Sequence, residues 1–79
     1  MVSRQDYLAL MQGMHRKLLN INCDIRAARK RNASREEIFS LMLRKKTVDK
    51  TYSKCVKNLD NLEEQDKTYR EAIHIYNTH

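Results

Sequence analysis

Apolar side chains recur along the chain in alternating three- and four-residue steps, the spacing of one face of an α-helix. The first stripe consists of Tyr7, Met11, Met14, Leu18, Ile21, Ile25, Ala28 and Asn32. Ser3, with the acidic Asp6 three residues later, precedes it in the manner of a helix N-cap. The pattern predicts a first helix over about residues 4–32.

The segment after this stripe carries the clearest local signal in the chain. Ser34 is followed three residues later by Glu37, so each can satisfy a backbone N–H of the other at a helix start. The residues before it include Arg29 and Lys30, whose charge complements the carboxyl end of a helix. The sequence therefore predicts a turn between a helix ending near 32 and another beginning near 35.

The second stripe is longer and keeps the same steps without a change of phase. It consists of Ile38, Leu41, Lys45, Val48, Tyr52, Cys55, Leu59, Leu62, Asp66, Tyr69, Ile73 and Tyr76. Its polar members, Lys45 and Asp66, occupy heptad core positions, where a polar side chain can fix register or oligomeric state. The stripe predicts a second helix over about residues 35–76, and the whole chain, residues 1–79, is expected to be a single all-α, coiled-coil-like antiparallel hairpin.

The two expected helices differ in length. At 1.5 Å per residue the first spans about 43 Å and an unbroken second about 63 Å, so about 16 residues lack a covering helix. Either this end packs on another chain, or the second helix breaks near Asn58–Asn61, with Asp60 and Glu63 as a capping pair, and folds back as a third helix. The unbroken phase favours the continuous helix.

Composition supports a small helical domain. The chain has 79 residues, no proline, no tryptophan and one glycine, which leaves few of the turn residues that an antiparallel sheet needs. A core of this size gives only a few kcal/mol of net stability, so completion by oligomerisation, as a dimer, or by a partner is expected. Cys23 and Cys55 have neither zinc-ligand nor disulfide-framework spacing.

Two sets of apolar residues exceed what one hairpin seam can bury, and we expect them to contact a partner. They are Phe39, Met42 and Leu43 near the turn, and Leu62, Tyr69, Ile73 and Tyr76 near the carboxyl end. Anchors at such spacing are typical of helix-in-groove or four-helix association. The expected function is therefore a protein–protein interaction or assembly module of the adaptor or co-chaperone type.

Charge supplies an alternative function. Residues 1–33 carry seven Lys/Arg against two Asp/Glu, whereas residues 61–79 carry two against four. The basic residues near the turn are Arg26, Arg29, Lys30, Arg31 and Arg35. Such a patch can neutralise phosphates, so nucleic-acid binding is the alternative, although the stacking aromatics of single-strand binders are committed to the seams.

Other chemistry receives little support. His15, His74 and His79 lack metal-ligand spacing, so no catalytic role, metal or cofactor is expected. The longest apolar run near the amino terminus, residues 8–11, is too short for a signal peptide or a membrane span. Membrane insertion is not expected, and a cytoplasmic location is.

In length and helix pattern the chain resembles small helical-hairpin families. These include plasmid-type RNA-binding hairpins that dimerise into four-helix bundles, and small co-chaperones of bacterial secretion machines. No motif of either family matches residue by residue, so no functional residue is carried over.

Overall fold

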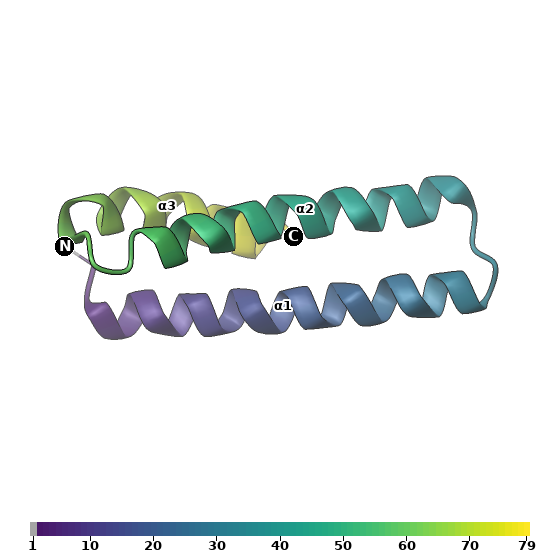
Figure 1. Cartoon of the computed structure of the whole chain (residues 1–79), viewed down its shortest axis with the longest axis horizontal. Coiled ribbons are helices and arrows are strands. Elements are labelled where there is room, and N and C mark those ends of the chain that lie inside the picture. The colour runs from purple at the N-terminus through teal and green to yellow at the C-terminus, as the bar shows by residue number, and fades with distance from the viewer. Residues whose placement is uncertain (1) are drawn as a thin grey trace.

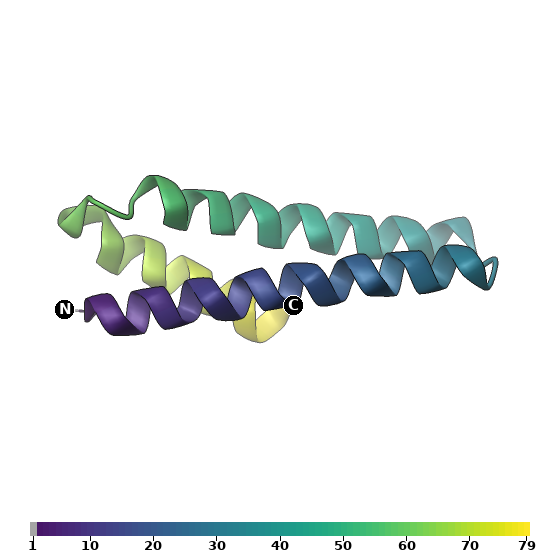
Figure 2. The ribbon, with the colours of Figure 1, turned by 60° about the horizontal axis from the view of Figure 1, so that its bottom comes forward.

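The computed structural model describes residues 2–79, which form three helices. They are α1 (Arg4–Lys30), α2 (Arg35–Lys57) and α3 (Leu62–Thr78). Helices α1 and α2 lie side by side and antiparallel, and α3 folds back along them in the direction of α1 (Figures 1 and 2). The bundle measures 45 × 19 × 17 Å. The predicted all-helical class is confirmed.

Local hydrogen bonds explain the turn between α1 and α2. Asn32 adopts a φ of 55°, the left-handed conformation that asparagine tolerates better than most residues. This lets Ala33 N–H donate to Ala28 O at 2.9 Å and Asn32 N–H donate to Arg29 O at 3.2 Å, the Schellman pattern that ends a helix. The α1 helix therefore stops at Lys30, close to the predicted boundary.

The predicted N-cap of α2 is confirmed. The Ser34 hydroxyl accepts from Glu37 N–H at 3.2 Å. The carboxylate of Glu37 does not reach back to Ser34 as expected but accepts a hydrogen bond from the Arg31 guanidinium. This ion pair links the last turn of α1 to the first turn of α2.

The favoured continuous second helix was wrong, and the three-helix alternative describes the chain. Helix α2 ends at Lys57 with Asn58 as its C-cap. The N-cap of α3 is Asn61, whose side chain accepts from Glu64 N–H at 3.3 Å, one residue later than the expected Asp60 and Glu63 pair. Asparagine and aspartate side chains compete for backbone hydrogen bonds, which offsets the continuous apolar phase.

Side chains of α3 also satisfy the end of α2. Gln65, which is buried, donates from Nε2 to Leu59 O at 2.6 Å and to Asn58 O at 3.3 Å. The Asn58 amide donates to Thr68 Oγ1 at 2.8 Å. Two carbonyls just beyond the end of α2 are therefore paired from within the fold.

The core lies between the three helices and continues between α1 and α2 towards their turn. Its buried apolar residues are Tyr7, Leu10, Met14, Ile21, Ile25, Ala28, Val48, Cys55 and Ala72. Tyr7 donates its hydroxyl to Cys55 O at 2.6 Å and so ties the start of α1 to the end of α2.

The carboxyl-terminal stripe does not lack cover, contrary to the expectation from helix lengths. Tyr69, Ile73 and Tyr76 are half-buried and pack against the core from α3. The break at residues 58–61 brings them back onto α1 and α2. Their burial there offsets the free energy lost by interrupting the helix. Near the start of α3, the Asp66 carboxylate accepts a hydrogen bond from Val2 N–H at 2.7 Å.

None of the helices described over residues 2–79 combines the length and the apolar composition needed to cross a membrane.

Candidate partner-binding site

The end of the bundle that holds the α1–α2 turn has only two helices across it. Helix α3 stops part of the way along the hairpin (Figure 1), where His79 O accepts hydrogen bonds from the Arg44 guanidinium. Beyond this point α1 and α2 pack on each other without a third helix. We call this end the tip.

Three apolar side chains of α2 are exposed at the tip. Phe39, Met42 and Leu43 are 62%, 47% and 49% exposed, and we call them the tip ridge. Ile38 and Leu41, their neighbours on the same two turns, are half-buried. One stripe of this segment therefore faces α1, and the remaining apolar surface faces solvent.

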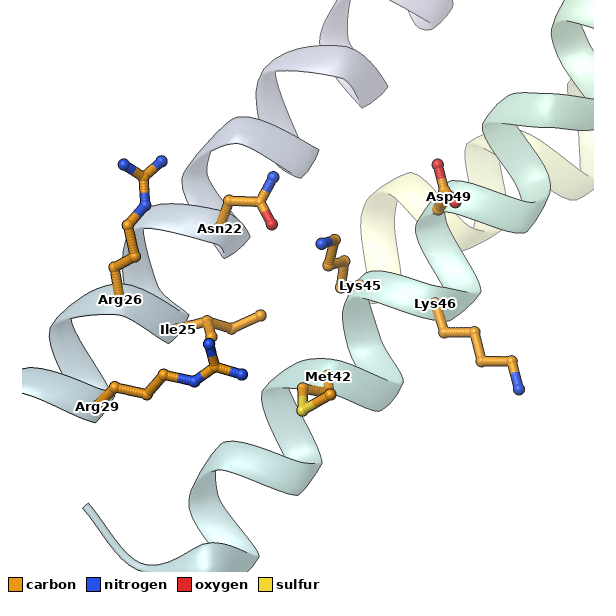
Figure 3. A pocket seen from close by; sticks show the side chains of 8 residues that line it. All are labelled: Asn22, Ile25, Arg26, Arg29, Met42, Lys45, Lys46 and Asp49. Carbon is orange, nitrogen blue, oxygen red and sulfur yellow. The ribbon is translucent and has the colours of Figure 1, made fainter. Parts of the chain in front are cut away.

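A hollow of about 410 Å³ lies between α1 and α2 beside the tip ridge. It is lined by Asn22, Ile25, Arg26, Arg29, Met42, Lys45, Lys46 and Asp49 (Figure 3). Four of these eight side chains are cations and one is an anion. We call it the cationic hollow.

Two of its cations converge. Figure 3 shows the Arg29 guanidinium and the Ile25 side chain extending from α1 towards α2, and the Lys45 side chain extending from α2 towards α1. Met42 lies on α2 beside them. The ion pairs found within residues 2–79 are Arg31–Glu37 and Lys54–Glu71, so neither Arg29 nor Lys45 has a carboxylate at bonding distance there. An arrangement of cations over an apolar floor suits an anionic ligand that also has apolar groups.

The structure gathers only part of the predicted basic patch. Arg26 and Arg29 line the cationic hollow, but Lys30 and Arg35 lie exposed at the turn and Arg31 is paired with Glu37. Lys45, which the sequence placed on the buried seam, is exposed and belongs to the hollow instead. The signal that could have found it is its charge, because a lysine without a partner is rarely buried.

A second hollow, of about 500 Å³, lies further along α1 and α2, away from the tip. Its lining is Leu8, Met11, Gln12, His15, Arg16, Leu19 and Tyr52. The rings of His15 and Tyr52, two of its lining residues, have centroids 6.0 Å apart and planes tilted by 37°. We call it the apolar hollow, because four of its lining residues are Leu, Met or Tyr. Sequence reasoning did not identify this site.

Leu62, also expected to bind a partner, is 65% exposed but lies at the other end of the molecule, at the start of α3. It is therefore separated from the tip ridge by the length of α2. The structure brings Phe39, Met42 and Leu43 together and places Leu62 apart from them.

The titratable groups with shifted pKa values lie in the core or at its edge. Burial raises the pKa of Tyr7 to about 12, and it also raises the pKa of the Cys55 thiol. Burial first, and the charge of Arg44 second, lower the pKa of Lys17, which donates to Tyr76 O and lies 4.7 Å from the centroid of its ring. Cys23 is exposed and Cys55, a member of the second predicted stripe, is buried.

Over residues 2–79 no group of three or more His, Cys, Asp or Glu side chains is placed to hold a metal ion. Comparison of the chain with models of protein families, with curated proteins and with solved structures gives no match.

Proposed function

We propose that the protein is a non-enzymatic interaction or assembly module of the adaptor or co-chaperone type, and that another protein or a second copy covers its tip. The observation that carries this proposal is the exposure of Phe39, Met42 and Leu43 where α3 no longer covers the hairpin. Completing the burial of side chains of this size stabilises a complex by about 1–2 kcal/mol each.

The position of the tip ridge supports the proposal. Three large apolar side chains within five residues of α2 form a contiguous surface, unlike Val56 and Leu62, which are exposed singly. The free, unpaired thiols Cys23 and Cys55 support a reducing compartment such as the cytoplasm as the place of action.

The test is site-specific cross-linking in the native cell. A photoreactive benzoylphenylalanine in place of Phe39 preserves an aromatic side chain at the ridge, and the same group in place of Lys50 is the control, because Lys50 is exposed on the same helix and lies on its α3 side. We expect a defined cross-linked product, with a second copy or with another protein, from position 39 and not from position 50. A chain that stays monomeric by light scattering and gives no product specific to position 39 contradicts the proposal.

A second candidate function is nucleic-acid binding, and the four cations of the cationic hollow favour it. Affinity for RNA or duplex DNA is then expected to fall by about one log unit per log of salt for each phosphate neutralised. Absence of a salt-sensitive mobility shift at low ionic strength removes this candidate.

A further inference from the structure

The two hollows form one line along α1 and α2. Their α1 residues include Leu8, His15, Leu19, Arg26 and Arg29, which follow one another at multiples of three- and four-residue steps on one helical stripe. On α2 the lining residues from 42 to 52 follow the same rule. From Leu8 to Arg29 the line extends for about 30 Å, the length of a helix of about 20 residues.

Helix α3 occupies a different face of the same two helices. It meets α1 at Gly13 and Lys17, which contact Tyr76, and it meets α2 at Lys54 and Asn58, which contact Glu71 and Thr68. On each helix these residues lie on a different side from those that line the hollows. The hairpin thus presents two long faces, one covered by α3 and one open.

The contacts on the covered face show how this hairpin holds a helix. Helix α3 lies parallel to α1 (Figure 2). Its apolar side chains pack on the core that α1 and α2 form. Its last carbonyls, Tyr76 O and His79 O, accept from the cationic side chains Lys17 and Arg44. The hairpin therefore holds a helix by apolar contacts along its length and by cations at its carboxyl end.

On the open face, apolar contacts and cations follow one another along α1 in the same order. Its apolar hollow lies beside the start of α1, and its cationic hollow lies towards the tip. A helix bound parallel to α1 would place its apolar residues over Leu8, Met11 and Leu19 and its carboxyl end over Arg29 and Lys45. Acidic residues near that end would meet the two cations that have no carboxylate partner there.

Charge argues against a second copy on this face. The two hollows together carry five Lys/Arg, namely Arg16, Arg26, Arg29, Lys45 and Lys46, against the single acidic Asp49. Two such faces pressed together would bring like charges into contact, which is costly.

We propose that the open face of the α1–α2 hairpin binds an amphipathic helix of another protein, with an apolar amino-terminal half and an acidic carboxyl-terminal half, lying parallel to α1. This proposal rests on the proposed function as an interaction module and adds the chemistry and direction of the partner. The bound helix would be the fourth helix of the bundle, with its carboxyl end reaching the tip beside Met42.

The test uses synthetic helical peptides and the full chain. One peptide has leucines at three- and four-residue spacing in its amino-terminal half and glutamates in its carboxyl-terminal half; a second has the same composition with the halves exchanged. Binding is measured by fluorescence anisotropy and located by backbone amide shifts in NMR spectra. We expect the first peptide to bind about tenfold more tightly than the second, a difference of about 1.4 kcal/mol. Shifts are expected at Leu19 and Arg29.

Matched charge variants separate the hollow from general electrostatics. Arg29→Glu with Lys45→Glu reverses the converging cations, whereas Lys30→Glu with Arg35→Glu makes the same change in net charge at exposed residues outside the hollow. We expect the first pair to weaken binding of the acidic peptide at least about tenfold more than the second pair. Circular dichroism checks that both variants remain helical.

The outcomes distinguish this inference from the proposed function. Equal affinity for both peptides, no binding at millimolar concentration, or shifts confined to Phe39 and Leu43 would overturn the inference, while a cross-link from position 39 would leave the proposed function standing. An oligonucleotide that competes for Arg29 and Lys45 and binds more tightly than the peptide would also overturn it, in favour of nucleic acid. Loss of both the peptide binding and the cross-link would refute both.

Discussion

The ring of Tyr76 on α3 rests against Gly13 on α1, so closely that a Cβ on Gly13 would lie 2.9 Å from Tyr76 Cε2. Gly13 is the only glycine in the chain and stands in the middle of a 27-residue helix, where glycine normally weakens the helix. Lys17, one turn further along α1, holds the same ring from its face, with Nζ 4.7 Å from the centroid. The absence of a side chain at Gly13 therefore sets how near α3 approaches α1.

This contact predicts an unusual result for Gly13→Ala. In an open helical position the change stabilises by about 1 kcal/mol, but here the added methyl must displace the Tyr76 ring, so we expect the gain to be cancelled or reversed. In a Tyr76→Ala background the same change is expected to stabilise. Urea unfolding of the four proteins of this cycle measures the coupling, expected at about 1 kcal/mol or more. Equal effects of Gly13→Ala in both backgrounds would contradict the packing role.

The buried amide of Gln65 predicts a second effect on stability. Gln65→Leu removes the donor to Asn58 O and Leu59 O and leaves two carbonyls at the end of α2 without that partner. We expect a loss of about 1–3 kcal/mol in the free energy of unfolding. Gln5→Leu, at an exposed position of α1, is the control and should change stability by less than about 0.5 kcal/mol. A Gln65 variant as stable as the control would show that these hydrogen bonds contribute nothing.

The buried hydroxyl of Tyr7 predicts weaker folding in alkali. Its pKa is raised to about 12 in the fold against 10.0 for an unperturbed tyrosine, so the neutral phenol is favoured in the folded state. The associated stability is fully present below pH 10 and is lost as the pH rises through 12. The shift corresponds to a fall of up to about 3 kcal/mol in the free energy of unfolding.

Denaturant unfolding between pH 9 and pH 12 measures this fall, with Tyr7→Phe compared with the unsubstituted chain. The phenylalanine variant starts less stable, because it lacks the bond to Cys55 O, but should decline less steeply over this range. Tyr69→Phe keeps the Tyr7 hydroxyl and should decline as the unsubstituted chain does. Parallel curves for Tyr7→Phe and the unsubstituted chain would refute the assignment.

The loop between α2 and α3 predicts a change of oligomeric state. Replacing Asn58 and Asn61 with alanine removes the Asn58 side-chain donor to Thr68 Oγ1 and the side-chain N-cap of α3, at a cost of about 1 kcal/mol each, and favours one continuous helix. The stripe from Ile38 to Tyr76 keeps its phase through the loop, so a continuous helix would still present it on one face. Its carboxyl-terminal part would then need a second copy, and we expect a swapped dimer.

Light scattering over a dilution series detects that dimer. The matched control replaces Asn20 and Asn77, which are exposed within α1 and α3, with alanine and should leave the oligomeric state unchanged. A monomeric Asn58 and Asn61 variant with three intact helices would mean that Gln65 and the packing of α3, rather than the caps, maintain the break.

Local signals were enough to predict most of the first two helices. Ser34, Glu37 and the two apolar stripes located the turn within two residues, because capping and periodicity act over one or two helical turns. The tip ridge was predicted for the same reason, since surplus apolar residues on a short segment can be counted without knowing the fold.

The candidate site was predicted only in part. Arg26, Arg29 and Met42 were named in advance, but Lys45 was assigned to the seam and the apolar hollow was missed. Both errors arise because the sequence patterns predict a pair of helices with one buried face. In the fold α3 also packs on α1 and α2, so the buried surface of each helix extends towards α3. Leu10 and Thr51 are buried for this reason although neither lies on a predicted seam.

The sequence by itself determined that the chain is helical, where its first turn lies and which end is basic, because these depend on neighbouring residues. Only the tertiary structure decided the fate of residues 58–79. A continuous helix and a folded-back α3 share one apolar phase, and they differ in whether Tyr69, Ile73 and Tyr76 find cover within the chain. That cover depends on the fit of Tyr76 to Gly13 and of Gln65 to the end of α2, contacts between residues distant in sequence that no local pattern records.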